Sequence, residues 1–248
     1  MLLVARDRRG SALTEAGAAF LPAARRTLAQ ADEAAAVARA VARGDAGRLR
    51  AGIAPTAASG PALTALAALR SDAPAIEVSV RELRQGELVL ALLGGEVDVA
   101  VMAVLAPPPL DQKIRWRNLS AEGFVAALPL VHPHASRSTL PLAALADDPF
   151  VTFARDQGER YHDALEGLCR AAGFTPRSEE AVYEVPTQLA LVAAGLGVAL
   201  VPESTRFLRS GDVAYVSLRE PTPTLTTVLA WREHGDTPAV TRLLSRLP

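Results

Sequence analysis

The residues best suited to ligand binding are hydroxyl side chains that follow predicted strands. Thr56 and Ser59 lie between a predicted strand, 48–53, and the helix after it, where free N–H groups begin the helix. The two hydroxyls and those N–H groups could hold a carboxylate, although N-capping of the helix explains the same residues equally well. Thr152 ends another predicted strand, and its hydroxyl faces either a cleft or the strand edge.

Other candidates lie at the ends of predicted elements. Gln85 follows the predicted strand 76–81 in a turn, where it reaches a cleft or is solvated. Met102 ends the predicted strand 97–102, and core filling is the commoner role of such a methionine. The remaining candidates are Pro186 and Thr187, which begin a helix, and Val201 and Pro202, which end the predicted strand 198–201 and shape a pocket wall.

Residues that could carry catalysis or hold a metal ion are sparse. His132 and His134 flank Pro133 without a nearby carboxylate or thiolate, which makes a poor metal site. His162 and Cys169 lie seven residues apart on one predicted helix, too far for a base and its nucleophile, so Cys169 reads as a buried structural thiol. No G-x-S-x-G, P-loop or H-E-x-x-H motif is present. We therefore predict no enzyme activity, no cofactor and no metal site.

The composition is that of a soluble globular protein. The 248 residues are 50% hydrophobic and 21% charged, and the longest apolar run, 189–202, is too short to span a bilayer. The N-terminus is arginine-rich and lacks the apolar stretch of a signal peptide. A single cysteine rules out an internal disulfide, so we expect a cytoplasmic protein.

The residues from Leu13 to Arg43 predict one long helix. Thr14 is a good N-cap, Glu15 suits the positive end of the helix dipole, and about half of the following residues are alanine. Small and apolar residues recur at steps of three or four and form one stripe: Phe20, Ala24, Leu28, Ala31, Ala35, Ala38 and Ala42. Such a stripe suits packing against a second copy, and the alternative is a solvated linker helix.

The first fifty residues carry an excess of positive charge. Nine arginines stand against five acidic residues there, a balance of +4, whereas the whole chain has a net charge of −1. This asymmetry is typical of an end that faces nucleic acid, and a solvated helix face explains it nearly as well.

The rest of the chain alternates between predicted strands and helices. This pattern predicts an α/β fold with mostly parallel sheets. Connectors near 118–122 and 218–224 divide it into two series, so we expect two lobes joined by two crossings, with the last strand and helix returning to the first lobe. Ligands bind beyond the carboxyl ends of strands in such sheets, which favours the cleft between the lobes.

Several motifs together resemble the LysR-type transcriptional regulators. They are Leu13-Thr14-Glu15-Ala16-Gly17 before an Ala/Leu/Arg helix, the run 47–53 (GRLRAGI), Glu96-Val97-Asp98-Val99-Ala100-Val101, the loop His132-Pro133-His134-Ala135, the run 169–176 (CRAAGFTP) and the run 191–202 (LVAAGLGVALVP). His134 departs from the leucine usual in that family. The motifs cover nearly the whole chain in the family's order.

The resemblance implies a periplasmic-binding-protein-like domain of two Rossmann-like lobes that binds a small-molecule effector, a small organic acid or metabolite, and controls transcription. It implies residues 1–12 as the remnant of a winged helix-turn-helix, 13–46 as a dimerising linker helix and 47–248 as the effector domain. Within it, lobe I spans about 47–118 and 224–248, and lobe II about 119–223. Pro186-Thr187 then lies opposite Thr56, and Phe20, Ala24, Leu28, Ala31 and Ala35 form the dimer contact.

The N-terminus departs from the family pattern. Only Leu2 to Gly10 precede the Leu-Thr-Glu-Ala-Gly element, where the family has a recognition helix for the DNA major groove. Arg6, Arg8 and Arg9 resemble a wing remnant that contacts the DNA backbone. We therefore expect promoter binding, as a dimer or tetramer, to need a complete winged helix-turn-helix. The alternatives are a cytoplasmic solute-binding protein without DNA binding and an enzyme on the same architecture.

Overall fold

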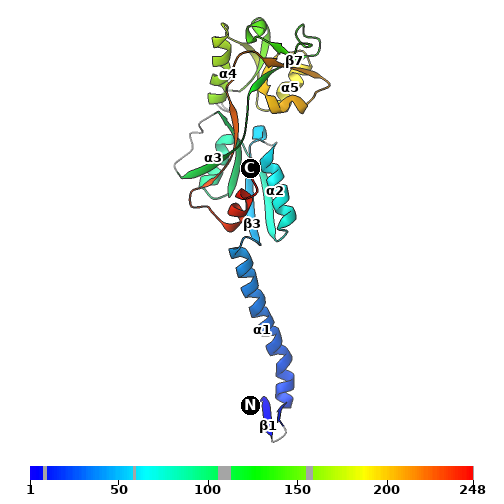
Figure 1. Cartoon of the computed structure of the whole chain (residues 1–248), viewed down its shortest axis with the longest axis vertical. Coiled ribbons are helices and arrows are strands. Elements are labelled where there is room, and N and C mark those ends of the chain that lie inside the picture. Colours follow the sequence, from blue (N-terminus) through cyan, green and yellow to red (C-terminus); the bar gives the residue numbers. More distant parts are fainter. Residues whose placement is uncertain (8–9, 58–59, 106–112, 155–158, 248) are drawn as a thin grey trace.

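The computed structural model describes residues 1–7, 10–57, 60–105, 113–154 and 159–247. A long helix, α1, extends from a two-lobed body, and a small hairpin lies at its far end (Figure 1). No helix in these ranges has the length and apolar character that a membrane crossing needs.

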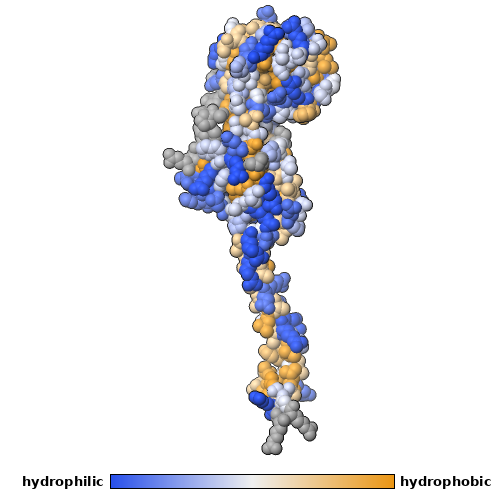
Figure 2. All heavy atoms as spheres, in the orientation of Figure 1, coloured by the Kyte–Doolittle hydropathy of each residue, from blue (hydrophilic) through white to orange (hydrophobic). Residues whose placement is uncertain are grey.

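Helix α1 spans Glu15–Ala42, as the sequence predicts. The Thr14 hydroxyl accepts a hydrogen bond from the Gly17 N–H at 3.0 Å, which confirms the predicted N-cap. Gly17 is the only buried residue of α1. Apolar and charged residues alternate along this exposed stalk (Figure 2), so the stalk has almost no core of its own within one chain.

Strands β1 (Val4–Asp7) and β2 (Gly10–Leu13) form an antiparallel hairpin that the sequence analysis missed. The hairpin is joined to the start of α1, because the Thr14 N–H donates to the Leu3 carbonyl at 3.1 Å. A side chain at Gly17 would overlap that same carbonyl group. The glycine therefore allows the hairpin and the helix to touch.

The first lobe is built on a five-stranded sheet of order β4-β3-β5-β13-β6. Its strands are β3 (Gly47–Ile53), β4 (Ile76–Glu82), β5 (Val99–Leu105), β6 (Ile114–Glu122) and β13 (Leu225–Arg232). Its helices are the short 3-10 helix η1 (Pro55–Ala57), α2 (Pro61–Asp72), α3 (Gln85–Leu93) and α6 (Pro238–Leu244). The last strand and helix thus return to this lobe, as predicted.

The second lobe combines a four-stranded sheet, β11-β7-β12-β8, with the parallel pair β10-β9. Its strands are β7 (Phe124–Pro129), β8 (Thr139–Leu140), β9 (Pro149–Phe153), β10 (Arg177–Val182), β11 (Ala199–Pro202) and β12 (Val213–Leu218). Its helices are η2 (Leu142–Leu145), α4 (Glu159–Ala171), α5 (Val185–Ala193) and η4 (Glu203–Phe207).

The prediction of mostly parallel sheets is wrong, because both main sheets are mixed. β3 pairs with β4 and β5 in parallel, but β13 inserts between β5 and β6 and runs antiparallel to both. In the second lobe β7 lies antiparallel to β11 and β12. The local sequence pattern indicates that a strand exists, but it does not indicate whether a distant strand pairs with it in parallel or antiparallel.

Two connections carry the chain between the lobes, at Gly123 and over residues 219–224, and they are tied to each other. The Phe124 N–H donates to the Thr222 hydroxyl at 3.0 Å. A side chain at Gly123 would collide with the same hydroxyl group, so the two crossings touch. The second lobe is therefore entered and left at one place.

One buried ion pair fixes the strands of the first lobe. Asp98 accepts hydrogen bonds from the Arg50 backbone N–H at 2.8 Å, from Arg50 Nε at 3.1 Å and from Arg50 Nη2 at 2.6 Å. Burial alone would raise the pKa of Asp98, but these hydrogen bonds and the charges of Arg50 and Arg232 outweigh it and hold the pKa below its ordinary value. The aspartate of the Glu96–Val101 motif is thus structural.

Candidate effector-binding site

The first lobe presents two predicted site residues beyond the carboxyl ends of its parallel strands. Thr56 lies in η1, which follows β3, and Gln85 is the first residue of α3, which follows β4. Both are half-buried. Gln85 and Gly86 belong to the helix and not to a separate turn, which corrects the prediction. Ser59 lies outside the described residues.

Met102 lies within β5 and not at its end, since the strand continues to Leu105. Its side chain is 1% exposed and belongs to the core of the first lobe. This burial favours the core-filling alternative for Met102. Ligand contact by this residue stays a prediction.

In the second lobe, Thr152 is half-buried in β9, and its hydroxyl is hydrogen-bonded to the Ser178 hydroxyl of β10. Pro186 and Thr187 are exposed in the first turn of α5, which begins at Val185 and not at Thr187. Val201 and Pro202 are buried at the end of β11, where Val201 belongs to the core of the lobe. Of these five residues, Thr152 and Thr187 therefore place hydroxyls near a strand end and a helix start.

The two lobes meet through aromatic residues. The Tyr161 ring of α4 lies 5.5 Å from Phe124 and 5.2 Å from Phe153, measured between ring centroids, in edge-on contacts. Tyr161 and Leu165 also pack against the core of the first lobe. Helix α4 is thus in contact with the cores of both lobes, so a change in its position alters packing in both.

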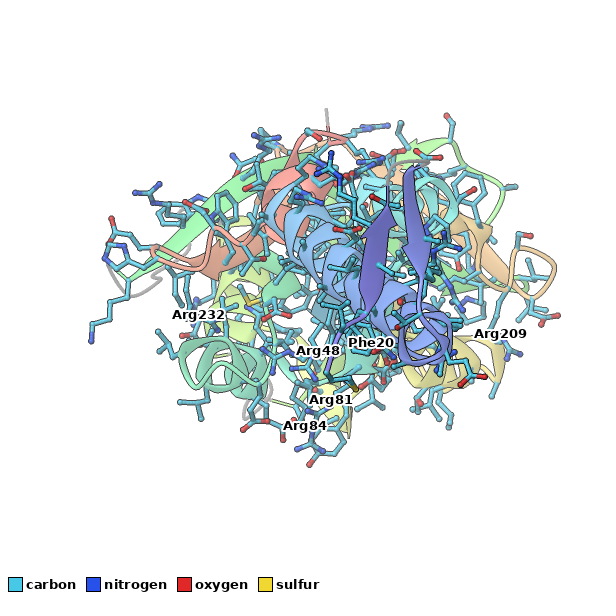
Figure 3. All side chains as sticks on the ribbon, turned by 90° about the horizontal axis from the view of Figure 1, so that it is seen from below. Phe20, Arg48, Arg81, Arg84, Arg209 and Arg232 are labelled. Carbon is cyan, nitrogen blue, oxygen red and sulfur yellow. The ribbon has the colours of Figure 1, made fainter. Side chains whose placement is uncertain are left out.

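A charged rim lies where α3 and α5 approach each other. The Arg84 guanidinium lies 5.7 Å from the centroid of the Tyr183 ring, a cation–π contact between the lobes. Burial raises the pKa of Glu184, and the charge of Glu82 adds to this, whereas Arg84 lowers it. Arg84 lies at the edge of the body (Figure 3).

The one cysteine does not support covalent catalysis. Cys169 is buried in the second lobe, and burial together with the nearby Glu166 charge raises its pKa to about 11. A thiol with such a pKa stays protonated near neutral pH and is a poor nucleophile.

Comparison with known proteins decides the family. The model of the LysR substrate binding domain matches residues 42–247. This chain belongs to the LysR family.

Curated LysR relatives align over most of the chain. An uncharacterized HTH-type transcriptional regulator of Escherichia coli K12, YnfL, is 32% identical over 94% of this chain and 78% of its own length. The HTH-type transcriptional regulator IlvR of Caulobacter vibrioides is 33% identical over 98% of this chain and 81% of its own length. The chain is accordingly a LysR-family transcriptional regulator with a substrate-binding domain.

Solved LysR structures confirm the predicted fold of two periplasmic-binding-protein-like lobes behind a long helix. CbnR, a LysR family transcriptional regulator, gives a TM-score of 0.81 at 28% identity, covering 100% of this chain and 85% of that one. Full-length CbnR complexed with its target DNA gives a TM-score of 0.80, covering 100% of this chain and 83% of that one. These relatives are regulators and offer no support to the solute-binding or enzyme alternatives.

Sequence reasoning missed several residues that matter in this LysR chain. Tyr161 joins the lobes, Arg84 and Tyr183 form the rim, and Gln188 of α5 is 1% exposed in the core of the second lobe. A buried glutamine inside an otherwise apolar helix face is itself a signal, because a buried amide needs partners. That signal was available in the sequence and was not used.

Proposed function

We propose that this LysR-family chain senses a small organic acid in the cleft between its lobes and transmits the binding to a dimer formed through α1. Promoter DNA is the proposed target of the dimer or tetramer, and the cytoplasm the proposed compartment. We propose the division given above into residues 1–12, 13–46 and 47–248. The predicted lobe boundary at 118 falls inside β6, which pairs with β13 as far as Glu122, so we propose lobe I at about 47–122 and 224–248 and lobe II at about 123–223. No catalytic role is proposed.

The observation that carries the effector proposal is the pair of half-buried hydroxyls, Thr56 and Thr152, at the carboxyl ends of strands in different lobes. Gln85 is the first residue of α3, Thr187 lies in the first turn of α5, and backbone N–H groups at helix starts bind anions. Arg84 at the rim adds a positive charge. An acid that contacts both lobes stabilises one lobe arrangement over another, and a regulatory ligand must do this.

The DNA contact is proposed for Arg6, Arg8 and Arg9, of which only Arg6 lies within the described residues. Arg6 is exposed in β1, at the far end of the stalk from the lobes. Arginine at such a position contacts phosphates or a minor groove, which fixes register without reading sequence. Base recognition is assigned to a complete winged helix-turn-helix.

The effector proposal is tested by calorimetric titration with acetate, succinate, citrate, benzoate and salicylate, with acetamide and benzamide as neutral controls. We expect at least one acid to bind and both amides to fail. Thr56→Val and Thr152→Val each remove one hydroxyl and should weaken that acid about tenfold, the worth of one hydrogen bond to a charged group. Thr27→Val, the same change on the stalk, is the matched control and should leave affinity unchanged. Equal affinity in both lobe variants would refute the site.

A further inference from the structure

A second polar site lies inside the second lobe, and Thr152 of the proposed effector site is among the residues that line it. A small cavity there is lined by residues of α4, β9, α5 and β11 and by Pro176 before β10, all of which belong to this lobe. Phe150, Leu165 and Leu200 supply apolar walls, and His162, Glu166 and Gln188 supply polar ones. A cavity that mixes these residue types suits a small polar or charged occupant.

Three buried polar atoms around this cavity have no hydrogen-bond partner among the described residues: Tyr161 Oη, His162 Nδ1 and Gln188 Oε1. The Gln188 amide is held in place, because its Nε2 donates to the Val151 carbonyl at 2.8 Å. Its Oε1 is therefore a fixed acceptor on a side chain that is 1% exposed. Leaving such atoms unpaired costs free energy, so their gathering around one cavity calls for a common explanation.

His162 also brings two carboxylates with it. Ligand atoms of His162, Asp163 and Glu166 all lie within 4.8 Å of one another. His162 Nδ1 is 3.9 Å from Asp163 Oδ1 and 3.8 Å from Glu166 Oε1. Two ligands on one tetrahedral zinc ion lie about 3.4 Å apart, given bonds of about 2.1 Å, so small side-chain movements close the set.

The local charges agree with this arrangement. Arg170 lies 3.5 Å from Glu166 Oε2, the oxygen other than the one nearest His162. One carboxylate oxygen thus faces a cation of the protein and the other faces the imidazole. Residues four apart, as His162 and Glu166 are, share one face of a helix, which is the spacing that paired metal ligands require.

We propose that His162, Asp163 and Glu166 of α4 bind a divalent transition-metal ion, with zinc as the best fit, and that the open position of the ion faces the cavity. One imidazole and two carboxylates suit zinc or manganese better than calcium, which prefers oxygen alone. Gln188 Oε1 lines the same cavity as His162 and Glu166, and it would accept a hydrogen bond from a water on the ion. The sequence analysis missed the site because it paired His162 with Cys169 and not with Glu166.

The position of the ion gives it a structural consequence. Tyr161 precedes the first ligand and contacts Phe124 and Phe153, and α4 packs against the cores of both lobes. An ion held by three α4 side chains therefore stiffens the helix that joins the lobes. Metal binding is thus expected to raise the stability of the body.

The test is calorimetric titration of the chelator-treated full chain with zinc chloride, then manganese and calcium chlorides. We expect one zinc ion per chain, weaker manganese binding and no calcium binding. His162→Ala and Glu166→Gln should each weaken zinc at least about tenfold, and Gln188→Leu by a similar factor, as outer-shell changes do. Thermal unfolding with and without zinc should show a stabilisation that the His162 and Glu166 variants lose.

His234→Asn, an exposed histidine elsewhere, and His134→Asn, in the other histidine cluster, are the matched controls and should bind zinc normally. Loss of binding in His134→Asn with normal binding in His162→Ala would overturn the proposal, as would unchanged affinity in both ligand variants. Asp163→Asn changes a half-exposed surface side chain and keeps the test decisive if His162→Ala does not fold. The spectrum of the cobalt(II)-loaded chain should lack a thiolate charge-transfer band. Such a band would assign the metal to Cys169 instead.

Discussion

The stalk and the two-lobed body differ in how many of their side chains are buried within one chain. The 28 residues of α1 bury a single glycine, and Phe20 and Leu28 are 49% and 67% exposed. Each lobe instead encloses aliphatic side chains that are almost fully buried, such as Leu49 and Leu88 in the first and Leu142 and Leu189 in the second. The body is therefore stabilised within one chain.

This difference leads us to expect that α1 contributes most of the free energy of dimer association. Helices gain most of their stability in proteins from packing of an apolar face, and α1 has no such packing within its own chain. Its base is anchored, since Arg242 of α6 donates to the Gly44 carbonyl at 3.1 Å. We expect the remaining length of α1 to gain its packing from a second copy, as proposed above.

The largest predicted effect is the loss of dimerisation through α1. Leu28→Asp combined with Ala35→Asp places two charges on the proposed stripe and should raise the dimer dissociation constant about a thousandfold, because apolar contact is lost and charge is buried. Sedimentation velocity over a concentration series measures it. The double variant Ala29→Asp, Ala36→Asp has the same spacing but lies off the stripe, since neighbouring helix positions are about 100° apart, and it should remain dimeric. A dimer that survives the first variant would show that the stripe is not the interface.

A smaller effect is expected inside the body, where the chain supplies its own partners. Asp98→Asn should lower the free energy of unfolding by about 3 kcal/mol, because it breaks a buried, multiply hydrogen-bonded pair and leaves the Arg50 charge without its partner. Urea unfolding at pH 7 measures this. Asp72→Asn, on an exposed pair with Arg246, is the control and should cost below about 1 kcal/mol.

The pH dependence of the same pair has a fixed sign. Because the folded pKa of Asp98 lies below the ordinary 3.8, its stabilisation is present above that pH and is lost as the pH falls through the folded value. The difference between the wild type and Asp98→Asn should therefore shrink below about pH 4. A constant difference from pH 7 to pH 3 would contradict the assignment.

The smallest predicted effect concerns the far end of the stalk. Gly17→Ala places a methyl group on the Leu3 carbonyl and should detach the hairpin from α1, at a cost of about 1–2 kcal/mol. Faster amide hydrogen exchange in β1 and β2, with the lobes unchanged, is the expected result. Gly167→Ala, in α4 with open space around the glycine, is the control and should be neutral or slightly stabilising. Unchanged exchange in Gly17→Ala would mean that the contact does not hold the hairpin.

Local signals predict most elements of this fold and few of its long-range pairings. The Thr14 cap and the alanine content define α1, and apolar runs define β5 and β7, because these signals act within a few residues. The hairpin was missed because the described side chains of β2 are all exposed and show no alternation. The place of β13 between β5 and β6 depends on pairing across more than one hundred residues, which no local pattern encodes.

The same limit applies to the sites. Hydroxyls after strands could be named from the sequence, because the carboxyl ends of parallel strands are a known place for ligands. The meeting of Gln188 from α5 with His162 and Glu166 from α4 could not, since it follows from how two helices pack around β9. Strand ends are also hard to place from the sequence: the strand predicted to end at Met102 continues to Leu105, and the Met102 side chain is 1% exposed.

The tie between Phe124 and Thr222 has a consequence for how this architecture can change over generations. Because the second lobe is entered and left at one joined point, it behaves as an inserted cassette with adjacent ends. A different lobe with the same end spacing can be substituted there without altering the stalk or the sheet of the first lobe. Recombination at this point would replace the lobe that carries Thr152 and keep α1 and the lobe that carries Thr56.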